Sequence, residues 1–429
     1  MAKGYTQEYG VDFHETFSPI FPIVLWPKAI LALAASHKWP LHQLDVNNAF
    51  LRGDLHEDVY MLVPNGLSYP PNMDFTQSKL DYSLFTHKAH DSINIVAIYV
   101  DDIIVIGKNV SLISHLKSHL HNIFNIKDLI GRLSVFLGLE LTYSANGIIV
   151  TQQKFSKELL RDTDISPLTP HFTPLPLNHK LSSNDSPLLP NPTLYHSLVG
   201  KLNFLTHTRP DLSYVVQTLS QHMQNPTTAH FEVVKHTLGY LSATLEKGIL
   251  LLASNQLTLQ AYSDSDWGAC PETRRSISGF FLLLGRSPIS WKSKTQATVS
   301  KSCSEAEYRS MASACSEVVW VVRLLEELGL HSLRPVTLHC ENISAIHIAQ
   351  NLVFHERTKH LEIDCHFTRD KVIEGLLQLI YLPTSSLLVD VFTKVIPSAQ
   401  FRHLLTKLGM SSPAKFEGLI RMYFGFLIL

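Results

Sequence analysis

The stretch INIVAIYVDDIIVIG (residues 93–107) decides the fold of the first part of this chain. Two short apolar runs, residues 93–98 and 103–106, lie on either side of the polar pair Asp101 and Asp102. Runs of β-branched residues around such a pair predict a tight β-hairpin, because Asp accepts turn geometry. Adjacent carboxylates repel one another unless a cation neutralises them. The pair is therefore either an ordinary turn or part of a Mg²⁺ site.

A further acid lies on a strand that precedes this hairpin in the chain. In LHQLDVNNAF (residues 41–50), side-chain alternation places Asp45 on the face opposite to Leu44. Asp45 can then join Asp101 and Asp102 on one sheet. Three carboxylates in that arrangement suit two-metal phosphoryl transfer, in which the ions lie about 3.5–4 Å apart.

Length and composition are those of a globular chain with room for two or three domains. The 429 residues are 45% hydrophobic and 17% charged, with a formal net charge of −1. The five cysteines are odd in number and form no CxxC pair, which predicts reduced thiols in an intracellular protein. No charge-free apolar run approaches about 18 residues, so no membrane partner is expected. Basic residues gather locally in residues 271–310, with seven Lys or Arg against three Glu.

The middle of the chain changes character twice. Seven prolines fall within residues 167–192, which predicts an extended linker or an irregular wrap. Apolar residues then recur at helical spacing from about residue 194 to residue 245. Near the start of the sequence, residues 28–37 are rich in Ala and Leu, which predicts a short helix.

Four acids in the last part of the chain stand at the ends of strands or the beginnings of helices. Asp264 and Glu341 end predicted strands, whereas Glu307 and Asp390 open predicted helices, where the helix dipole favours negative charge. Acids in this order are typical of an RNase H-like fold. Asp266 and Glu305 lie beside Asp264 and Glu307 as less favoured ligands.

Motifs in both parts resemble one family. LHQLDVNNAFLRGDLHEDVYM, YVDDIIVIG, YSDSDW, SEAEY, HCEN and VDVFTK stand in the order found in Pol polyproteins of copia-type LTR retrotransposons. The chain resembles a plant-like, degenerate fragment of such a polyprotein. The resemblance implies an incomplete α+β polymerase palm, a helical connection and an α/β RNase H-like domain.

The same resemblance divides the chain into five parts. They are a truncated and internally shortened fingers and palm (residues 1–165), a Pro-rich linker (166–193), a helical, thumb-like connection (194–256), an RNase H-like domain (257–395) and a C-terminal tail (396–429). The implied activities are RNA-directed DNA polymerase and ribonuclease H.

The resemblance also implies the site residues. The metal-binding catalytic acids would be Asp45, Asp101, Asp102, Asp264, Glu307, Glu341 and Asp390, and the nucleotide contacts Val46, Phe50 and Tyr99. Phe50 matches the aromatic residue that blocks the 2′-OH of a ribonucleotide. The candidates for binding backbone phosphates are Arg274, Arg275, Lys292, Lys294 and Lys301.

The implied cofactor is Mg²⁺, with Mn²⁺ as the alternative ion. The implied partners are an RNA template, a DNA primer, RNA–DNA hybrid and dNTPs, without a membrane and with the oligomeric state left open. The family places such proteins in the cytoplasm, within a virus-like particle, or in the nucleus.

Departures from the family predict impaired catalysis. The basic fingers segment is missing before AKGYTQ, and only residues 62–82 stand where the family has a longer palm segment. Glu341 stands where the family has Asp, and its extra methylene moves the carboxylate in a site that must hold Mg²⁺ at about 2.0–2.1 Å. A catalytically dead relic that keeps nucleic-acid binding is therefore the alternative, and a reused nucleic-acid-binding scaffold is a third hypothesis.

One more stretch, HERTKHLEIDCH (residues 355–366), gathers His, Asp and Cys. Its spacing does not match the paired-ligand patterns of structural zinc sites. Contact with the substrate backbone, or a structural role, is the favoured interpretation.

Overall fold

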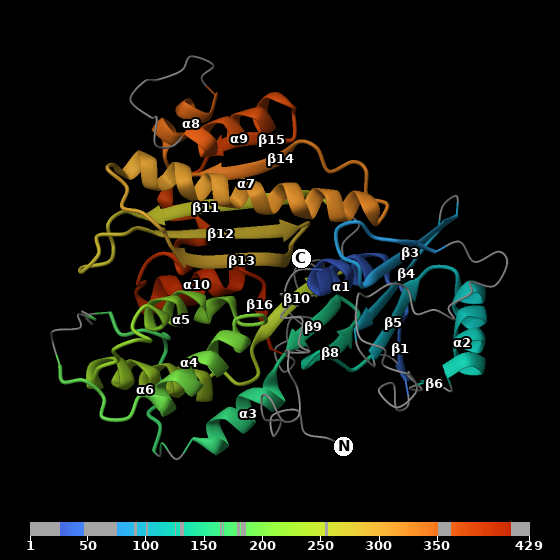
Figure 1. Ribbon diagram of the computed structural model, residues 1–429, viewed down its shortest axis with the longest axis horizontal. Helices are drawn as coiled ribbons and strands as arrows, with labels where there is room; N and C mark the ends of the chain where they lie inside the picture. The colour runs from blue at the N-terminus through green and yellow to red at the C-terminus, as the bar shows by residue number, and fades with distance from the viewer. Residues whose placement is uncertain are drawn as a thin grey trace, which may run out of the picture.

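The structure is a computed structural model that describes residues 26–46, 75–89, 92–99, 102–124, 126–128, 133–163, 165, 167–177, 181, 186–253, 256–350 and 362–412. Three β-sheets with helices packed against them make up these ranges (Figure 1). Among the helices described, none is long and apolar enough to cross a membrane.

The first sheet contains the predicted hairpin. Tyr99 lies opposite Asp102 in an antiparallel pair of strands, which confirms the hairpin, and Asp45 lies opposite Asp102 on the other side. The strand order is β2-β3-β4-β5-β1-β6, with bounds β1 Leu41–Val46, β2 Thr76–Gln77, β3 Leu84–Ala89, β4 Ser92–Tyr99, β5 Asp102–Gly107 and β6 Ile126–Asp128. Helix α2 (Val110–Phe124) packs its apolar face on this sheet. Helix α1 (Trp26–His37) confirms the helix expected over residues 28–37.

The second sheet is assembled from distant parts of the chain. Its order is β16-β10-β9-β8-β7, with bounds β7 Val135–Phe136, β8 Leu139–Ser144, β9 Gly147–Thr151, β10 Gly248–Leu252 and β16 Met410–Ser411. β10 pairs antiparallel with both β9 and β16. One sheet therefore holds strands that precede the Pro-rich stretch, a strand that follows the helical region and the last strand described.

The segment predicted as a C-terminal tail, residues 396–429, is helical and stranded within its described part, residues 396–412. Helix α10 (Ser398–Lys407) buries Phe401, Leu404 and Leu405, whose spacing puts them on one face. That face joins the buried cluster of the helical region, and the chain then enters the second sheet through β16.

The third sheet has a mixed strand order that defines the RNase H-like architecture. The order is β13-β12-β11-β14-β15, with bounds β11 Leu259–Asp266, β12 Ile277–Leu284, β13 Ser287–Thr295, β14 Val336–Cys340 and β15 Leu377–Tyr381. The first three strands are antiparallel neighbours, whereas β14 runs parallel to both β11 and β15. The helices of this part are α7 Cys303–Glu327, α8 Ile343–Gln350 and α9 Glu362–Ile373.

The late helix expected around Asp390 is a 3₁₀ helix, η6 (Leu388–Phe392), and not the start of an α-helix. Ile396 precedes Pro397, and a residue before proline is disfavoured in the α region. The α-helical conformation therefore resumes only at Ser398, in α10. A shorter 3₁₀ turn, η5 (Thr384–Ser386), lies just before η6.

The helical region forms a cluster beneath the third sheet (Figure 1). It contains α3 Gln153–Asp162, α4 Thr193–Leu205, η3 Pro210–Leu212, α5 Ser213–Ser220 and α6 Thr228–Ser242. The described part of the Pro-rich stretch wraps against α6, where Thr237 donates a hydrogen bond to the carbonyl of Pro174. Gly239 lets this crossing come close, because a β-carbon there would lie 2.1 Å from the carbonyl oxygen of Thr169.

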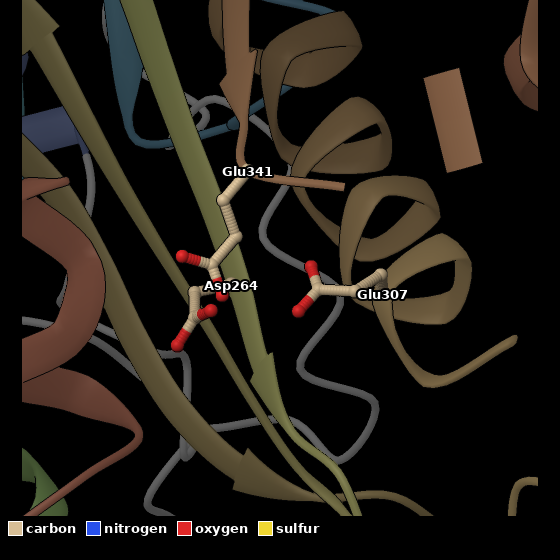
Figure 2. A group of neighbouring side chains, drawn as sticks. All are labelled: Asp264, Glu307 and Glu341. Atoms are coloured by element: carbon tan, nitrogen blue, oxygen red, sulfur yellow. The ribbon is translucent and has the colours of Figure 1, made fainter. Parts of the chain in front are cut away.

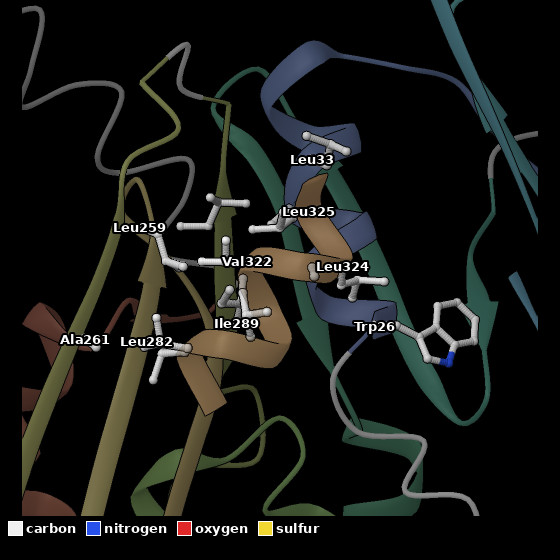
Figure 3. Packing of buried hydrophobic residues seen from close by; sticks show 14 of the residues in the cluster. Trp26, Leu33, Leu259, Ala261, Leu282, Ile289, Val322, Leu324 and Leu325 are labelled. Atoms are coloured by element: carbon white, nitrogen blue, oxygen red, sulfur yellow. The ribbon is translucent and has the colours of Figure 1, made fainter. Parts of the chain in front are cut away.

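Buried apolar side chains link the sheets. One cluster contains residues of α1, the second sheet, the third sheet and α7, and Figure 3 shows part of it. Leu33 of α1 and Leu325 of α7 both belong to this cluster, although they lie far apart in the sequence. The polymerase-like and RNase H-like parts thus share one core in the described ranges.

Candidate metal centre

Three carboxylates converge at one edge of the third sheet. Asp264 comes from β11, Glu307 from the first turns of α7, and Glu341 directly follows β14 (Figure 2). One oxygen from each lies within 4.8 Å of the others. Asp264 and Glu307 are buried, whereas Glu341 is half-buried, so the group opens towards solvent on the Glu341 side.

The fourth predicted acid joins this group through a lysine. The Nζ atom of Lys394 lies 3.1 Å from Oδ1 of Asp390, 3.3 Å from Oδ2 of Asp264 and 3.5 Å from Oε1 of Glu341. Lys394 ends the VDVFTK motif, for which no role of this lysine is predicted from the sequence. Its spacing of four residues from Asp390 was the available signal, since such pairs share one helical face.

Backbone and hydroxyl groups hold the buried acids in place. The hydroxyl of Thr393 donates to Oδ2 of Asp264, and the backbone N–H of Ser265 donates to Oε1 of Glu307 at 3.1 Å. η6 can bring Thr393 so close because β12 carries Gly279 at the point of contact, opposite Asp264. The sequence offered no local signal for this approach.

Burial and mutual repulsion make the centre unfavourable for negative charge. Burial, followed by the nearby charge of Asp264, raises the pKa of Glu307 to about 9. Burial likewise raises the pKa of Asp390 to about 6, although Lys394 opposes that shift. The pKa of Lys394 rises despite its burial, because Asp264, Asp390 and Glu341 all favour its ammonium form. A cation among these oxygens would offset the repulsion, so an all-carboxylate donor set fits a hard divalent ion.

The acids considered less favoured have other contacts. Glu305 forms an ion pair with Arg309 at 2.9 Å and accepts from the backbone N–H of Lys301, which places it at the cap of α7. Asp266 stands at the end of β11 and is half-buried, and burial raises its pKa.

The predicted phosphate-binding residues are exposed around the same sheet. Arg274 and Arg275 lie between β11 and β12, Lys292 and Lys294 lie on β13, and Lys301 directly precedes α7. Exposed cations at these positions are free to meet a polyanion. The stretch at residues 355–361 lies outside the described residues, as do the side chains of residues 362–365.

The polymerase-side residues are described only in part. Asp102 begins β5, and its Oδ1 accepts a hydrogen bond of 2.9 Å from Nε2 of Gln43. The Cα pairing places Asp45 opposite Asp102, but the side chains of Asp45 and Val46 lie outside the description. Phe50, Asp101 and most of the shortened palm segment, residues 62–74, also lie outside it.

Comparison with known proteins agrees with these features. The family model for "Reverse transcriptase (RNA-dependent DNA polymerase)" matches residues 1–72 and 69–176. The Pol polyproteins of transposons RE2 and RE1 of Arabidopsis thaliana are 36% and 37% identical over 98% and 96% of this chain. The matches cover 31% and 30% of those proteins, so the chain spans about a third of the length of these relatives.

Solved structures with a related arrangement are distant in sequence. RNase H1 from Halobacterium salinarum is 13% identical, with a TM-score of 0.23, over 32% of this chain and 94% of that one. The foamy viral protease-reverse transcriptase in complex with dsDNA is 12% identical, with a TM-score of 0.19, over 83% of this chain and 71% of that one.

The fold and the acidic centre define a polymerase palm joined to an RNase H-like domain. The chain belongs to the copia-type retrotransposon Pol family, and the part matched by the reverse transcriptase model ends at residue 176.

Proposed function

We propose that this chain acts on RNA–DNA hybrids as a ribonuclease H linked to an RNA-directed DNA polymerase, with both activities impaired. The polymerase would use an RNA template, a DNA primer and dNTPs, and both centres would use Mg²⁺ or Mn²⁺. Family resemblance favours the cytoplasm, within a virus-like particle, or the nucleus as the place of action.

The observation that carries the nuclease proposal is the meeting of Asp264, Glu307 and Glu341 within 4.8 Å, with Asp390 tied to them by Lys394. Four acids from four separate elements converge at the end of one sheet. Carboxylates that bind no cation normally stay apart at the surface, because burial of unpaired charge is costly. A divalent cation is the metal ion that suits this set of oxygen ligands.

Each residue has a distinct task in this proposal. Divalent metals, when bound, would activate the attacking water and stabilise the leaving oxygen of the scissile phosphate. Thr393 fixes the orientation of the Asp264 carboxylate, and the N–H of Ser265 does the same for Glu307. Lys394 supplies a positive charge at the mouth of the centre. Arg274, Arg275, Lys292, Lys294 and Lys301 would contact the hybrid backbone.

Cleavage of a labelled RNA–DNA hybrid by the purified chain, with Mg²⁺ or Mn²⁺, tests the proposal. Asp264→Asn and Asp390→Asn should each abolish the activity. Asp266→Asn is the matched control on the same strand and should retain most of it. Cleavage that survives Asp264→Asn would show that the acidic centre is not the nuclease.

A second candidate, a relic that binds nucleic acid without cleaving it, is favoured by Glu341, which stands where the family has Asp. Fluorescence anisotropy with a labelled hybrid separates the two. Binding without cleavage in either metal supports the relic, whereas measurable turnover supports the enzyme.

A further inference from the structure

A cleft of about 710 Å³ lies alongside β13, the edge strand of the third sheet. Its walls come from α1, the loop before β3, the α4–α5 region and α7, so parts of the polymerase-like and RNase H-like regions face each other across it. None of the four acids of the metal centre lines this cleft. It is therefore a separate site.

A buried lysine lies in its wall. Lys28 of α1 is 3% exposed, and its Nζ lies 3.6 Å from the ring centroid of Trp291. Within the described part of the chain, no hydrogen bond or ion pair satisfies this amine. Burial lowers the pKa of Lys28 to about 7, and the nearby charge of Glu317 only partly opposes the shift. An anion reaching Lys28 would restore its full charge.

Two hydroxyl groups beside the cleft are also unsatisfied. Ser213 and Ser293 line it, and among the residues described the Oγ atom of each is buried without a hydrogen-bond partner. Buried polar atoms are normally paired, so unpaired hydroxyls on two residues that line one cavity indicate a missing acceptor. An ammonium and two hydroxyls are donors that the oxygens of a phosphate can accept from.

The acids in the cleft are, by contrast, already engaged. Glu317 accepts from the hydroxyl of Ser290 at 2.7 Å, and Asp81 accepts from the backbone N–H of Ser83 at 2.9 Å. Lys292 and Lys294 stand exposed at the rim and add positive charge. The groups of the cleft that remain available to a ligand are therefore mostly cationic or hydrogen-bond donors, which favours an anion.

Four aromatic side chains form part of the wall. Trp26, Trp291, Trp320 and Tyr82 line the cleft, and Trp291 is fixed by its Nε1–H, which donates to the carbonyl of Thr206 at 2.9 Å. Aromatic side chains beside cations are what proteins use to stack nucleobases without reading their sequence.

We propose that this cleft binds one nucleotide unit, with its phosphate on Lys28, Ser213 and Ser293 and its base against the aromatic wall. The unit comes either from a free nucleotide or from the end of an unpaired strand. The site goes beyond the proposed catalytic function, because none of its residues belongs to either acidic centre.

Binding is tested by quenching of tryptophan fluorescence in the whole chain, in buffer containing EDTA. Without divalent metal, phosphate should not bind at the acidic centres. Absence of dAMP binding in this buffer is therefore distinguishable from failure of the proposed catalysis. The probes are dAMP, a 5′-phosphorylated six-residue oligo(dA), deoxyadenosine and inorganic phosphate. Saturable quenching by dAMP, weaker for deoxyadenosine and for phosphate, is expected.

The variants separate a ligand site from a structural role. Lys28→Met keeps the packing of α1 and should weaken dAMP binding by about tenfold or more, because a charge-assisted contact is lost. Ser213→Ala and Ser293→Ala should weaken it less and remain informative if Lys28→Met does not fold. Ser220→Ala is the matched control, since Ser220 lines the cleft but already bonds the carbonyl of Val216.

Each result decides the proposal. Tighter binding of the oligonucleotide than of dAMP identifies a strand end, and equal binding identifies a free nucleotide. The proposal is overturned if neither probe binds, which leaves a cleft filled only by water. It is also overturned if phosphate binds as well as dAMP, or if none of the three variants changes affinity.

Discussion

A β-carbon on Gly279 would lie 2.8 Å from Cγ2 of Thr393, so the bare backbone of β12 is what allows the end of η6 to reach Asp264. The same position would meet the side chains of Phe392 and Val389 at 2.9 and 3.2 Å. The acidic centre therefore depends on a residue that bears no side chain.

Gly279→Ala should displace η6 and with it the groups that orient Asp264. Overpacking of this kind destabilises by about 1–3 kcal/mol, and a shift of about 1 Å at a reacting group can cost about 10²-fold in rate. Thermal unfolding and hybrid cleavage measure the two effects. Gly200→Ala in α4 is the control, because a β-carbon there meets nothing within 4 Å and alanine favours helix. Equal behaviour of the two variants would contradict the close-approach argument.

Glu341→Asp should increase turnover if the acidic centre is the proposed nuclease. Glu341 reaches the centre with its longer side chain, where Oε2 accepts from the hydroxyl of Thr384 at 2.6 Å and Oε1 faces Lys394. The shorter carboxylate should place the metal-binding oxygen better for Mg²⁺, which tolerates little distortion. The larger Mn²⁺ should partly rescue the unaltered chain.

Cleavage rates for both proteins in both metals provide the measurement. If Glu341→Asp changes nothing in either metal, the ligand set has to be reassigned, with Glu305 or Asp364 as candidates. Glu305 would first have to leave its ion pair with Arg309.

DNA synthesis by this chain should be absent or very weak, although Asp45, Asp101 and Asp102 are all present. Positioning of the primer end supplies much of the rate of phosphoryl transfer. By the resemblance, residues 62–82 stand where the family has a longer segment that would support the templating base pair. Incorporation of dNTPs on poly(rA)·oligo(dT) measures the activity. Robust incorporation that Asp101→Asn abolishes would falsify this expectation.

The helical region should lose much of its stability when Asp211 is changed to Asn. Arg209 and Asp211 form a buried ion pair with an N–O distance of 2.7 Å, and the hydroxyl of Tyr240 donates to the same carboxylate at 2.6 Å. Removing one partner of a buried pair costs about 3–5 kcal/mol, because the other charge is left uncompensated. Denaturant unfolding measures the loss. Glu232→Gln breaks the exposed pair with Lys235 and should cost no more than about 1 kcal/mol.

The same pair predicts how stability depends on pH. Burial would raise the pKa of Asp211, but Arg209 and Tyr240 outweigh it, so the pKa in the folded chain lies below its ordinary value. The unfolded chain therefore binds the proton more readily, and this stabilisation is present above about pH 4 and lost as the pH falls further. Unfolding curves between pH 3 and pH 7 should show a shallower acid loss for Asp211→Asn than for the unaltered chain. Parallel curves would show that Asp211 does not carry this dependence.

The local sequence pattern was enough to predict several of the elements that hold the candidate site residues. The β-branched runs around Asp102 predicted the hairpin, because strand period and turn chemistry are both local properties. The Ala- and Leu-rich run predicted α1. The positions of Asp264, Glu307, Glu341 and Asp390 at the ends of elements predicted that they could meet, and the structure brings them together.

What could not be predicted depends on contacts between distant residues. Thr393 reaches Asp264 across 129 positions, and only the packing of η6 on Gly279 brings them together. The Pro-rich stretch could be predicted as a wrap or a linker, but not its docking on Gly239 of α6. α10 is equally non-local, since its apolar face has no partner until the helical region is folded.

The second sheet has a consequence for how the chain would respond to being cut. β9 precedes the Pro-rich stretch, whereas β10 and β16 follow it, yet the three strands are hydrogen-bonded neighbours. A single cleavage at the exposed residue Leu188 would therefore yield two polypeptides that remain bound to each other and elute as one particle. The same two polypeptides, made separately, are natural candidates for reassembly, because β9 on one and β10 on the other each leave an open strand edge that the other pairs.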